Sequence, residues 1–184
     1  PNAHLVAYPI AGGRQLNVVA VLPGTWNRPG WSTPGDPFEV MEAFAAPRWP
    51  PTARMMLATV DSWRKWALFG VPDGCPWSKG PVALLGDAVH AMLPFAAQGA
   101  GMAIEDAAVL ARHLSLETAE DANSVAAALK QYGRARQARV GKVQRTARQQ
   151  GRIYHLGGPF AIARDLAIRA LGPERMLARQ DWIY

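Results

Sequence analysis

The chain has 184 residues, 49% of them hydrophobic and 18% charged, with a formal net charge of +6 at pH 7. This composition excludes a disordered chain, which could not bury enough apolar surface to offset the entropy of ordering. A single cysteine, Cys75, excludes an internal disulfide and a cysteine-based zinc or iron–sulfur site. The sequence contains no run of about 18 apolar residues, so it predicts no membrane span. We therefore expect a packed protein of a reducing compartment, the cytoplasm.

The N-terminal part has the pattern of a hairpin followed by short elements. Two β-rich runs, His4–Pro9 and Gln15–Leu22, flank a short linker with two glycines, which predicts a β-hairpin. Residues 23–37 hold four prolines and three glycines and predict a long surface loop. The next expected elements are helices over 38–45 and 52–59, a strand over 64–71 and a turn at Pro72-Asp73-Gly74. Because the first residue is Pro1 and a strand follows at once, we expect the chain to be a fragment.

An apolar run, Val82–Leu85, stops at Gly86 and Asp87. It predicts a short strand buried on both faces of a parallel or mixed sheet. Asp87 would then lie at the carboxyl edge of the sheet, where open α/β sheets bind ligands, and could accept hydrogen bonds from hydroxyl groups. The alternative is that Asp87 caps a turn with its own backbone.

Gly99 and Gly101 precede a helix predicted over Met102–Leu114, with Glu105 and Asp106 expected in its first turn. Unpaired N–H groups at such a helix start could stabilise an anion. An ordinary helix start built from small residues has the same pattern. The segment is not a dinucleotide fingerprint, because its third glycine is missing and its glycines do not follow the strand directly.

A long helix is expected over Val125–Tyr154, with glycines at 133, 141 and 151 as weak points, and shorter helices over 160–171 and 173–179. This long segment carries eight bases and no acid, namely Lys130, Arg134, Arg136, Arg139, Lys142, Arg145, Arg148 and Arg152. The bases of such a helix typically face solvent, an acidic partner or another domain. The alternative function is a non-catalytic binding module whose basic helix grips nucleic acid or an acidic protein.

The stretch from Gly86 to Asp106 resembles the second flavin-binding motif of class A FAD-dependent aromatic hydroxylases. It reads Gly-Asp-Ala-Val-His at 86–90, a proline at Pro94, and Gln-Gly-Ala-Gly-Met-Ala-Ile-Glu-Asp at 98–106. A later stretch, Gln-Gly-Arg-Ile-Tyr-His-Leu at 150–156, is similar to the salicylate and 3-hydroxybenzoate hydroxylase branch. The resemblance extends from His4 to Tyr184. One departure is Ala91, where the family has proline.

The resemblance implies roles for the motif residues. Asp87, beside Gly86, would bind a ribityl hydroxyl of FAD, and Pro94 would lie next to the flavin. The backbone of the helix start would face the isoalloxazine N1 and C2 carbonyl through Gly99, Ala100, Gly101 and Met102. A helix start carries partial positive charge, so it would favour the negative charge of a reduced flavin.

The resemblance also implies roles for two residues of the first strand. His4 and Tyr8 are four residues apart and so point to one face of the strand. His4 would be the base that removes the phenol proton, and Tyr8 would orient the substrate. The alternative is that His4 is a hydrogen-bonded sheet histidine. The other histidines, His90, His113 and His155, are expected to be structural.

The implied fold is mixed α/β and forms part of a flavin monooxygenase. Residues 1–80 would belong to a substrate-binding β-sheet domain, 81–115 to a flavin-binding strand-loop-helix, and 116–184 to a C-terminal helical region. The full enzyme would take hydride from NADH or NADPH onto FAD, form a flavin C4a-hydroperoxide with dioxygen, and hydroxylate a small phenolic or aromatic acid.

The resemblance further implies a missing N-terminal portion that clamps the ADP half of FAD, so we expect this chain alone to be inactive. No metal or membrane partner is implied. We do not expect a nucleic-acid partner, and the resemblance is compatible with a homodimer.

Overall fold

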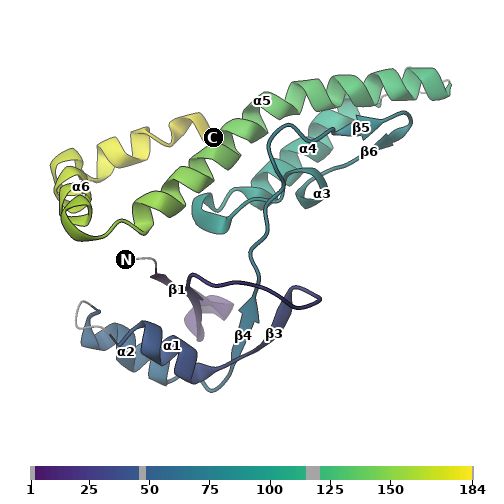
Figure 1. Cartoon of the computed structure of the whole chain (residues 1–184). Coiled ribbons are helices and arrows are strands. Elements are labelled where there is room, and N and C mark those ends of the chain that lie inside the picture. The colour runs from purple at the N-terminus through teal and green to yellow at the C-terminus, as the bar shows by residue number, and fades with distance from the viewer. Residues whose placement is uncertain (1–2, 46–48, 115–120, 184) are drawn as a thin grey trace. The chain divides into compact units, whose positions relative to one another are not determined.

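The computed structural model describes residues 3–45, 49–114 and 121–183 (Figure 1). Helices predominate, and the described strands form three two-stranded antiparallel sheets, which confirms the predicted mixed α/β class. The chain divides into two compact units. The first unit comprises Pro1–Leu68 and Tyr154–Gly172, and the second comprises Phe69–Ile153 and Pro173–Tyr184. Each unit has a hydrophobic cluster of its own.

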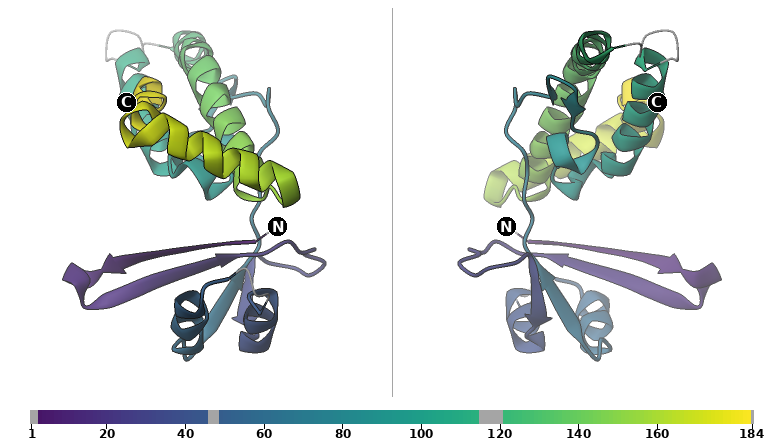
Figure 2. Two further views of the ribbon diagram at one scale, coloured as in Figure 1. Left: turned by 90° about the vertical axis from the view of Figure 1, so that its left-hand side faces the viewer. Right: turned by 90° about the vertical axis from the view of Figure 1, so that its right-hand side faces the viewer.

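The predicted hairpin opens the first unit. Strands β1 (His4–Ile10) and β2 (Gln15–Val21) pair antiparallel along their whole length, from His4 opposite Val21 to Ile10 opposite Gln15 (Figure 2). The short 3-10 turn η1 (Ala11–Gly13) joins them. Its two glycines have φ angles of 66° and 85°, a left-handed region that glycine adopts without steric cost. The glycine-containing linker therefore marked the turn correctly.

The region predicted as one long loop contains a strand, so that prediction is wrong in part. Strand β3 (Ser32–Gly35) pairs antiparallel with β4 (Trp63–Trp66), which is shorter than the strand predicted over 64–71. A Cβ on Gly35 would lie 3.0 Å from the Cβ of Trp63, so glycine permits this close pairing. The strand escaped prediction because Pro34 and Gly35 are poor strand formers that only an edge position accommodates.

Two short helices cover the first unit's core, as predicted. Helix α1 (Pro37–Ala43) begins at Asp36, whose carboxylate accepts a 2.8 Å hydrogen bond from the backbone N–H of Phe38. Helix α2 (Pro51–Ala58) follows. The buried core of the unit comprises Val40, Phe44 and Leu57, and partly buried residues of the hairpin pack against it.

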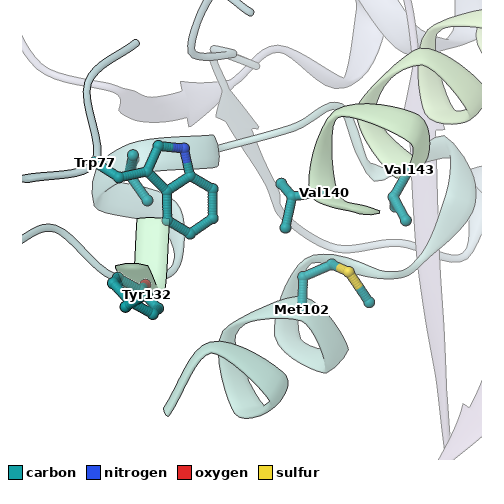
Figure 3. Close-up of a cluster of buried hydrophobic side chains, with 6 residues drawn as sticks. Trp77, Met102, Tyr132, Val140 and Val143 are labelled. Atoms are coloured by element: carbon teal, nitrogen blue, oxygen red, sulfur yellow. The ribbon is translucent and has the colours of Figure 1, made fainter. Parts of the chain in front are cut away.

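The second unit is built on three helices, α3 (Asp87–His90), α4 (Gly99–His113) and α5 (Ala122–Tyr154), the last of which ends in the first unit. Its core is drawn in Figure 3 and comprises Trp77, Val89, Met102, Tyr132, Val140 and Val143. Two glycines of α5 permit close packing in this unit. A Cβ on Gly133 would lie 2.9 Å from the Cβ of Trp77, and one on Gly151 would collide with the ring of Phe95.

The apolar run Val82–Leu85 is not a strand buried on both faces, so that prediction is wrong. Only Val82 and Ala83 form strand β6, which pairs with the two-residue strand β5 (Ser78–Lys79). Val82 is 62% exposed and Leu84 is 42% exposed. The described residues offer this run one short partner strand and no layer that covers both its faces, which an apolar run alone cannot reveal.

The C-terminal region follows the prediction of two short helices. Helix α6 (Gly158–Ala178) is interrupted at Gly172, where φ is 71° and ψ is 169°, and Pro173 follows directly. A final 3-10 turn, η3 (Asp181–Ile183), packs in the second unit. Among the residues described, no helix is both long and apolar enough to cross a membrane.

Candidate functional site

A cleft in the second unit gathers most of the residues singled out in the flavin-type motif. Its volume is about 590 Å³, and its lining comprises Leu85, Gly86, Asp87, Met92, Pro94, Ala97, Gln98, Gly99, Ala100 and Ala103. This volume lies in the range of about 300–1,000 Å³ that is typical of small-molecule sites. Five of the seven predicted cofactor residues line it. Gly101 and Met102 do not.

Asp87 reaches the cleft from a helix start rather than from the edge of a sheet. Gly86 precedes α3 with φ 60° and ψ −138°, and a Cβ there would lie 3.1 Å from the Cβ of Ala103. Glycine is thus required both by the backbone conformation and by the close approach of α4. Asp87 is the first residue of α3, and its Oδ1 lies 3.9 Å from where a Cβ on Gly99 would stand. The carboxylate therefore lies against the start of α4.

Helix α4 begins three residues before the predicted start and has no side-chain cap. Its first backbone hydrogen bond runs from the N–H of Met102 to the carbonyl of Gln98, over 2.9 Å. The N–H groups of Gly99, Ala100 and Gly101 precede that bond and are available to an acceptor outside the helix. The side chain of Met102 is buried in the core, so only its backbone belongs to the helix start.

One buried carboxylate holds this loop and helix in place. Asp106 Oδ2 accepts hydrogen bonds from His90 Nε2 at 2.6 Å and from the backbone N–H of Gly86 at 3.2 Å. Its Oδ1 accepts one from Arg136 Nε at 2.7 Å. Burial alone would raise the pKa of Asp106, but the hydrogen bonds from His90, Arg136 and Gly86 outweigh it and lower the pKa. The charged carboxylate thus ties the turn before α3 to α4 and α5.

The expected position of Glu105 and Asp106 in the first turn of the helix is wrong, because α4 starts earlier and no acid stands in its first turn. Sequence reasoning also missed the positioning role of Asp106. The sequence signal for this role was that Asp106 and His90 belong to the same motif. Their contact depends on a fold-back of the chain that no local pattern specifies.

Half of the bases of the basic helix contact residues of their own unit. Arg139 donates two 2.6 Å hydrogen bonds to the carboxylate of Glu105, and these, as the largest cause, lower the pKa of Glu105. Arg139 also donates to the backbone carbonyls of Trp182 and Ile183. Arg148 pairs with Asp73 at 2.6 Å. Arg136 also pairs with Asp106, and Lys142 lies 3.7 Å over the ring of Trp182. Four of the eight bases thus have partners among the residues that the structure describes.

His90 is buried inside the second unit. Its ring is 1% exposed, pairs with Asp106 and lies 5.5 Å from the ring of Trp77. In the part of the chain that the structure describes, no three His, Cys, Asp or Glu side chains are grouped so that they could hold a metal ion.

A second cluster of predicted site residues lies in the first unit. His4 Nδ1 is 2.9 Å from His155 Nε2, and the two ring centroids are 5.0 Å apart. The ring of Tyr154 lies 5.5 Å from that of His4. Burial, and secondarily the charge of His155, lower the pKa of His4, and burial lowers the pKa of His155. Tyr8, four residues along β1, is 46% exposed and stands opposite Asn17.

No partner could be named for His155 from the sequence, because 151 residues separate it from His4. The Gln-Gly-Arg-Ile-Tyr-His-Leu stretch was the one signal that could have directed attention to it.

Comparison with known proteins defines the class. Residues 39–147 match the family described as the FAD binding domain. This match covers more than half of the chain and includes the whole cleft. The chain therefore belongs to the FAD binding domain family, and the family resemblance noted in the motif is confirmed.

The relatives include proteins named as hydroxylases of 3-hydroxybenzoate and of salicylate. The chain is 35% identical over 184 residues to a 3-hydroxybenzoate 6-hydroxylase of Polaromonas naphthalenivorans, with 100% of this chain and 44% of that protein covered. It is 34% identical over 190 residues to a salicylate hydroxylase of Pseudomonas putida, with 100% and 42% covered. The chain thus spans less than half the length of these relatives.

Solved structures agree on the fold. A salicylate hydroxylase substrate complex matches with a TM-score of 0.78 and 30% identity, covering 99% of this chain and 44% of that one. A structure of Klebsiella pneumoniae HpxO complexed with FAD matches with a TM-score of 0.76 and 25% identity, covering 98% and 46%.

Proposed function

We propose that this chain is part of a FAD-dependent monooxygenase that hydroxylates a small phenolic or aromatic acid. The observation that carries the proposal is the cleft in which the carboxylate of Asp87 lies against the uncapped, glycine-rich start of α4. Membership of the FAD binding domain family supports FAD as the ligand of this cleft. The names of the relatives support the substrate class.

The chemistry of the cleft fits a flavin. Asp87 offers carboxylate oxygens that can accept hydrogen bonds from ribityl hydroxyls. The N–H groups of Gly99, Ala100 and Gly101 offer donors for the N1 and C2 carbonyl edge of the isoalloxazine. Because Gly99 and Gly101 have no side chains, a planar ring can approach the backbone closely. Gly86, Pro94 and the backbone of Met102 complete the set of residues that we assign to the cofactor.

When bound, FAD would accept hydride from NADH or NADPH and deliver one oxygen atom of dioxygen to the ring of the substrate. The role of the chain is electrostatic and positional. The positive end of α4 would stabilise negative charge at the N1 edge by about 0.3–1 kcal/mol, and by up to about 2 kcal/mol when partly buried. Asp106 and His90 would hold the loop that presents Asp87 and Pro94.

His4 is proposed as the base that removes the phenol proton, and Tyr8 as a residue that orients the substrate. The lowered pKa of His4 supports this role, because it keeps the imidazole neutral and able to accept a proton at neutral pH. Removing the phenol proton increases the electron density of the ring, which then reacts more readily with an electrophilic oxygen.

The activity is assigned to the longer protein, since the chain aligns with 42–44% of these hydroxylases. Within it, residues 1–80 would form part of the substrate-binding sheet domain, 81–115 the flavin-binding segment and 116–184 the helical region. We propose that this chain alone is inactive and that the enzyme works in the cytoplasm. Half of the basic side chains of this helix have partners within their own unit, among the described residues. No observation therefore favours the nucleic-acid alternative.

The test is flavin binding by the full-length protein and by Asp87→Ala. We expect a flavin absorbance spectrum in the purified protein, and a dissociation constant for FAD at least about 10-fold higher in Asp87→Ala, since a lost hydrogen bond to a charged group costs about 1.5–3 kcal/mol. The matched control is Asp61→Ala, which removes an exposed acid outside the cleft. A colourless preparation that gains no flavin when FAD is added would overturn the proposal.

A further inference from the structure

Arg139 on α5 binds two separate parts of the second unit at once. Its guanidinium donates two 2.6 Å hydrogen bonds to the carboxylate of Glu105 on α4. The same group donates to the backbone carbonyls of Trp182, at 3.2 Å, and Ile183, at 2.6 Å. Because a guanidinium is planar and rigid, these four hydrogen bonds fix the 3-10 turn η3 relative to α4.

The turn η3 is also held by contacts of its own. Ile183 is buried, and its N–H donates a 2.9 Å hydrogen bond to the carbonyl of Gln180. The ring of Trp182 packs against the core of the unit and lies 3.7 Å from Nζ of Lys142. The turn therefore has a defined position, in which its carbonyls reach Arg139.

Glu105 connects this arrangement to the loop that lines the cleft. Its Oε2 lies 2.8 Å from Nη1 of Arg136, a buried side chain whose Nε donates to Asp106 at 2.7 Å. Asp106 accepts in turn from the backbone N–H of Gly86, at 3.2 Å. A continuous series of hydrogen bonds and ion pairs thus leads from η3 through the two arginines to Gly86.

The two arginines hold the part of α4 that matters for the cleft. They are three residues apart on α5 and so lie on one face of that helix. Their partners on α4 are the side chains of Glu105 and Asp106 and, at 3.4 Å from Arg136, the carbonyl of Met102. These residues directly follow the uncapped N–H groups of residues 99–101. A rotation of α4 at this turn would therefore move those N–H groups relative to Asp87.

We propose that Arg139 is a positioning residue through which η3 fixes the start of α4 for flavin binding. This inference rests on the proposed function, in which the N–H groups of that helix start face the flavin. Arg139 touches neither flavin nor substrate in this proposal, and it acts through Glu105 and Arg136. Without this role it would form an ordinary, partly exposed ion pair, whose loss would leave the affinity for FAD unchanged.

The first test is FAD titration of the full-length protein at a temperature at which far-UV circular dichroism shows each variant folded. Arg139→Met keeps an unbranched side chain but removes all four hydrogen bonds. We expect it to raise the dissociation constant for FAD about 2- to 30-fold, the range found for residues that couple to a site through others. Arg139→Lys keeps the charge but not the planar fork, and should retain part of the affinity. The matched control is Arg148→Met, which breaks an ion pair of similar exposure on the same helix and should leave the dissociation constant unchanged.

The second test asks whether Arg139 acts through Glu105 and together with η3. Glu105→Gln and Trp182→Ala should each raise the dissociation constant for FAD. Combining either one with Arg139→Met should raise it little beyond the larger single effect, because residues of one network are not additive. Multiplied effects in the double variants would overturn the inference, and so would an unchanged dissociation constant in Trp182→Ala.

These outcomes separate failure of the inference from failure of the proposed function. If the unmodified protein takes up no FAD, the proposed function falls and the inference falls with it. If it binds FAD and Arg139→Met binds FAD equally well, the proposed function stands and only the role of Arg139 is overturned. If Arg139→Met does not fold, Arg139→Lys and Trp182→Ala decide, and unchanged affinity in both would overturn the inference.

Discussion

The two units hold their candidate site residues in different ways. In the second unit a fully buried carboxylate, Asp106, binds a histidine, an arginine and a backbone N–H at once. In the first unit His4 and His155 share one hydrogen bond, and neither ring is fully buried. In the proposed function the cleft holds a cofactor, which needs fixed geometry, whereas His4 is a base, which must gain and lose a proton without disturbing the fold. Strong charged contacts suit the first requirement and a neutral, partly exposed pair suits the second.

The largest effect that tests this contrast is expected at Asp106. Asp106→Ala leaves Arg136 and His90 buried without their carboxylate, and losing one partner of such a buried pair costs about 3–5 kcal/mol. The free energy of unfolding, measured by urea denaturation, should fall by that amount. The control is Asp73→Ala, which breaks a half-exposed pair with Arg148 and should cost at most about 1 kcal/mol. Equal losses in the two variants would contradict the central role of Asp106.

Two glycines of α5 test how closely the second unit is packed. A Cβ on Gly151 collides with the ring of Phe95, so Gly151→Ala should cost about 1–3 kcal/mol through overpacking. A Cβ on Gly141 meets only the flexible end of Arg145, at 3.2 Å. Gly141→Ala should therefore stabilise the helix by up to about 1 kcal/mol, because alanine is the better helix former. Thermal unfolding of both variants measures the difference, and a gain in stability for Gly151→Ala would contradict the packing at Phe95.

The smallest effect is a difference in the response of the two units to acid. In the folded state the pKa of His4, which faces His155 and Tyr154, is lower than in the unfolded chain. Protonation of His4 therefore favours the unfolded chain, so the free energy of unfolding is undiminished above about pH 6.5 and decreases as the pH falls through the lowered value. The folded state also lowers the pKa of Asp106, so its contribution persists until the pH drops below about 3.9.

Amide hydrogen exchange, corrected for its intrinsic pH dependence, measures this difference. Protection in β1 should weaken at mildly acidic pH, while protection in α4 should remain until the pH approaches 4, the ordinary range of a carboxyl group. Simultaneous loss of protection in both elements would mean that the units do not respond separately.

Several features of the fold were accessible from the sequence because their causes are local. The glycine linker marked the hairpin, Asp36 and Pro37 marked the start of α1, and Gly172 with Pro173 marked the break in α6. In each case the determining residues are adjacent in the chain and act on the backbone next to them. The flavin-type motif was accessible for a similar reason, since all the lining residues of the cleft lie within Leu85–Ala103.

Features that depend on distant pairing required the tertiary structure. The β3–β4 pair joins segments about 30 residues apart in which Pro34 and Gly35 conceal the strand. The exposure of Val82–Leu85 depends on which layers cover it, and apolar composition alone does not reveal that.

The sequence by itself determined the hairpin, the main helices and the composition of the flavin-type loop, because backbone preferences and motif spacing are local properties. Only the tertiary structure decided that Asp106 organises that loop and that His155 is the partner of His4. A hydrogen bond between residues 151 positions apart depends on the whole path of the chain, and no local pattern encodes that path.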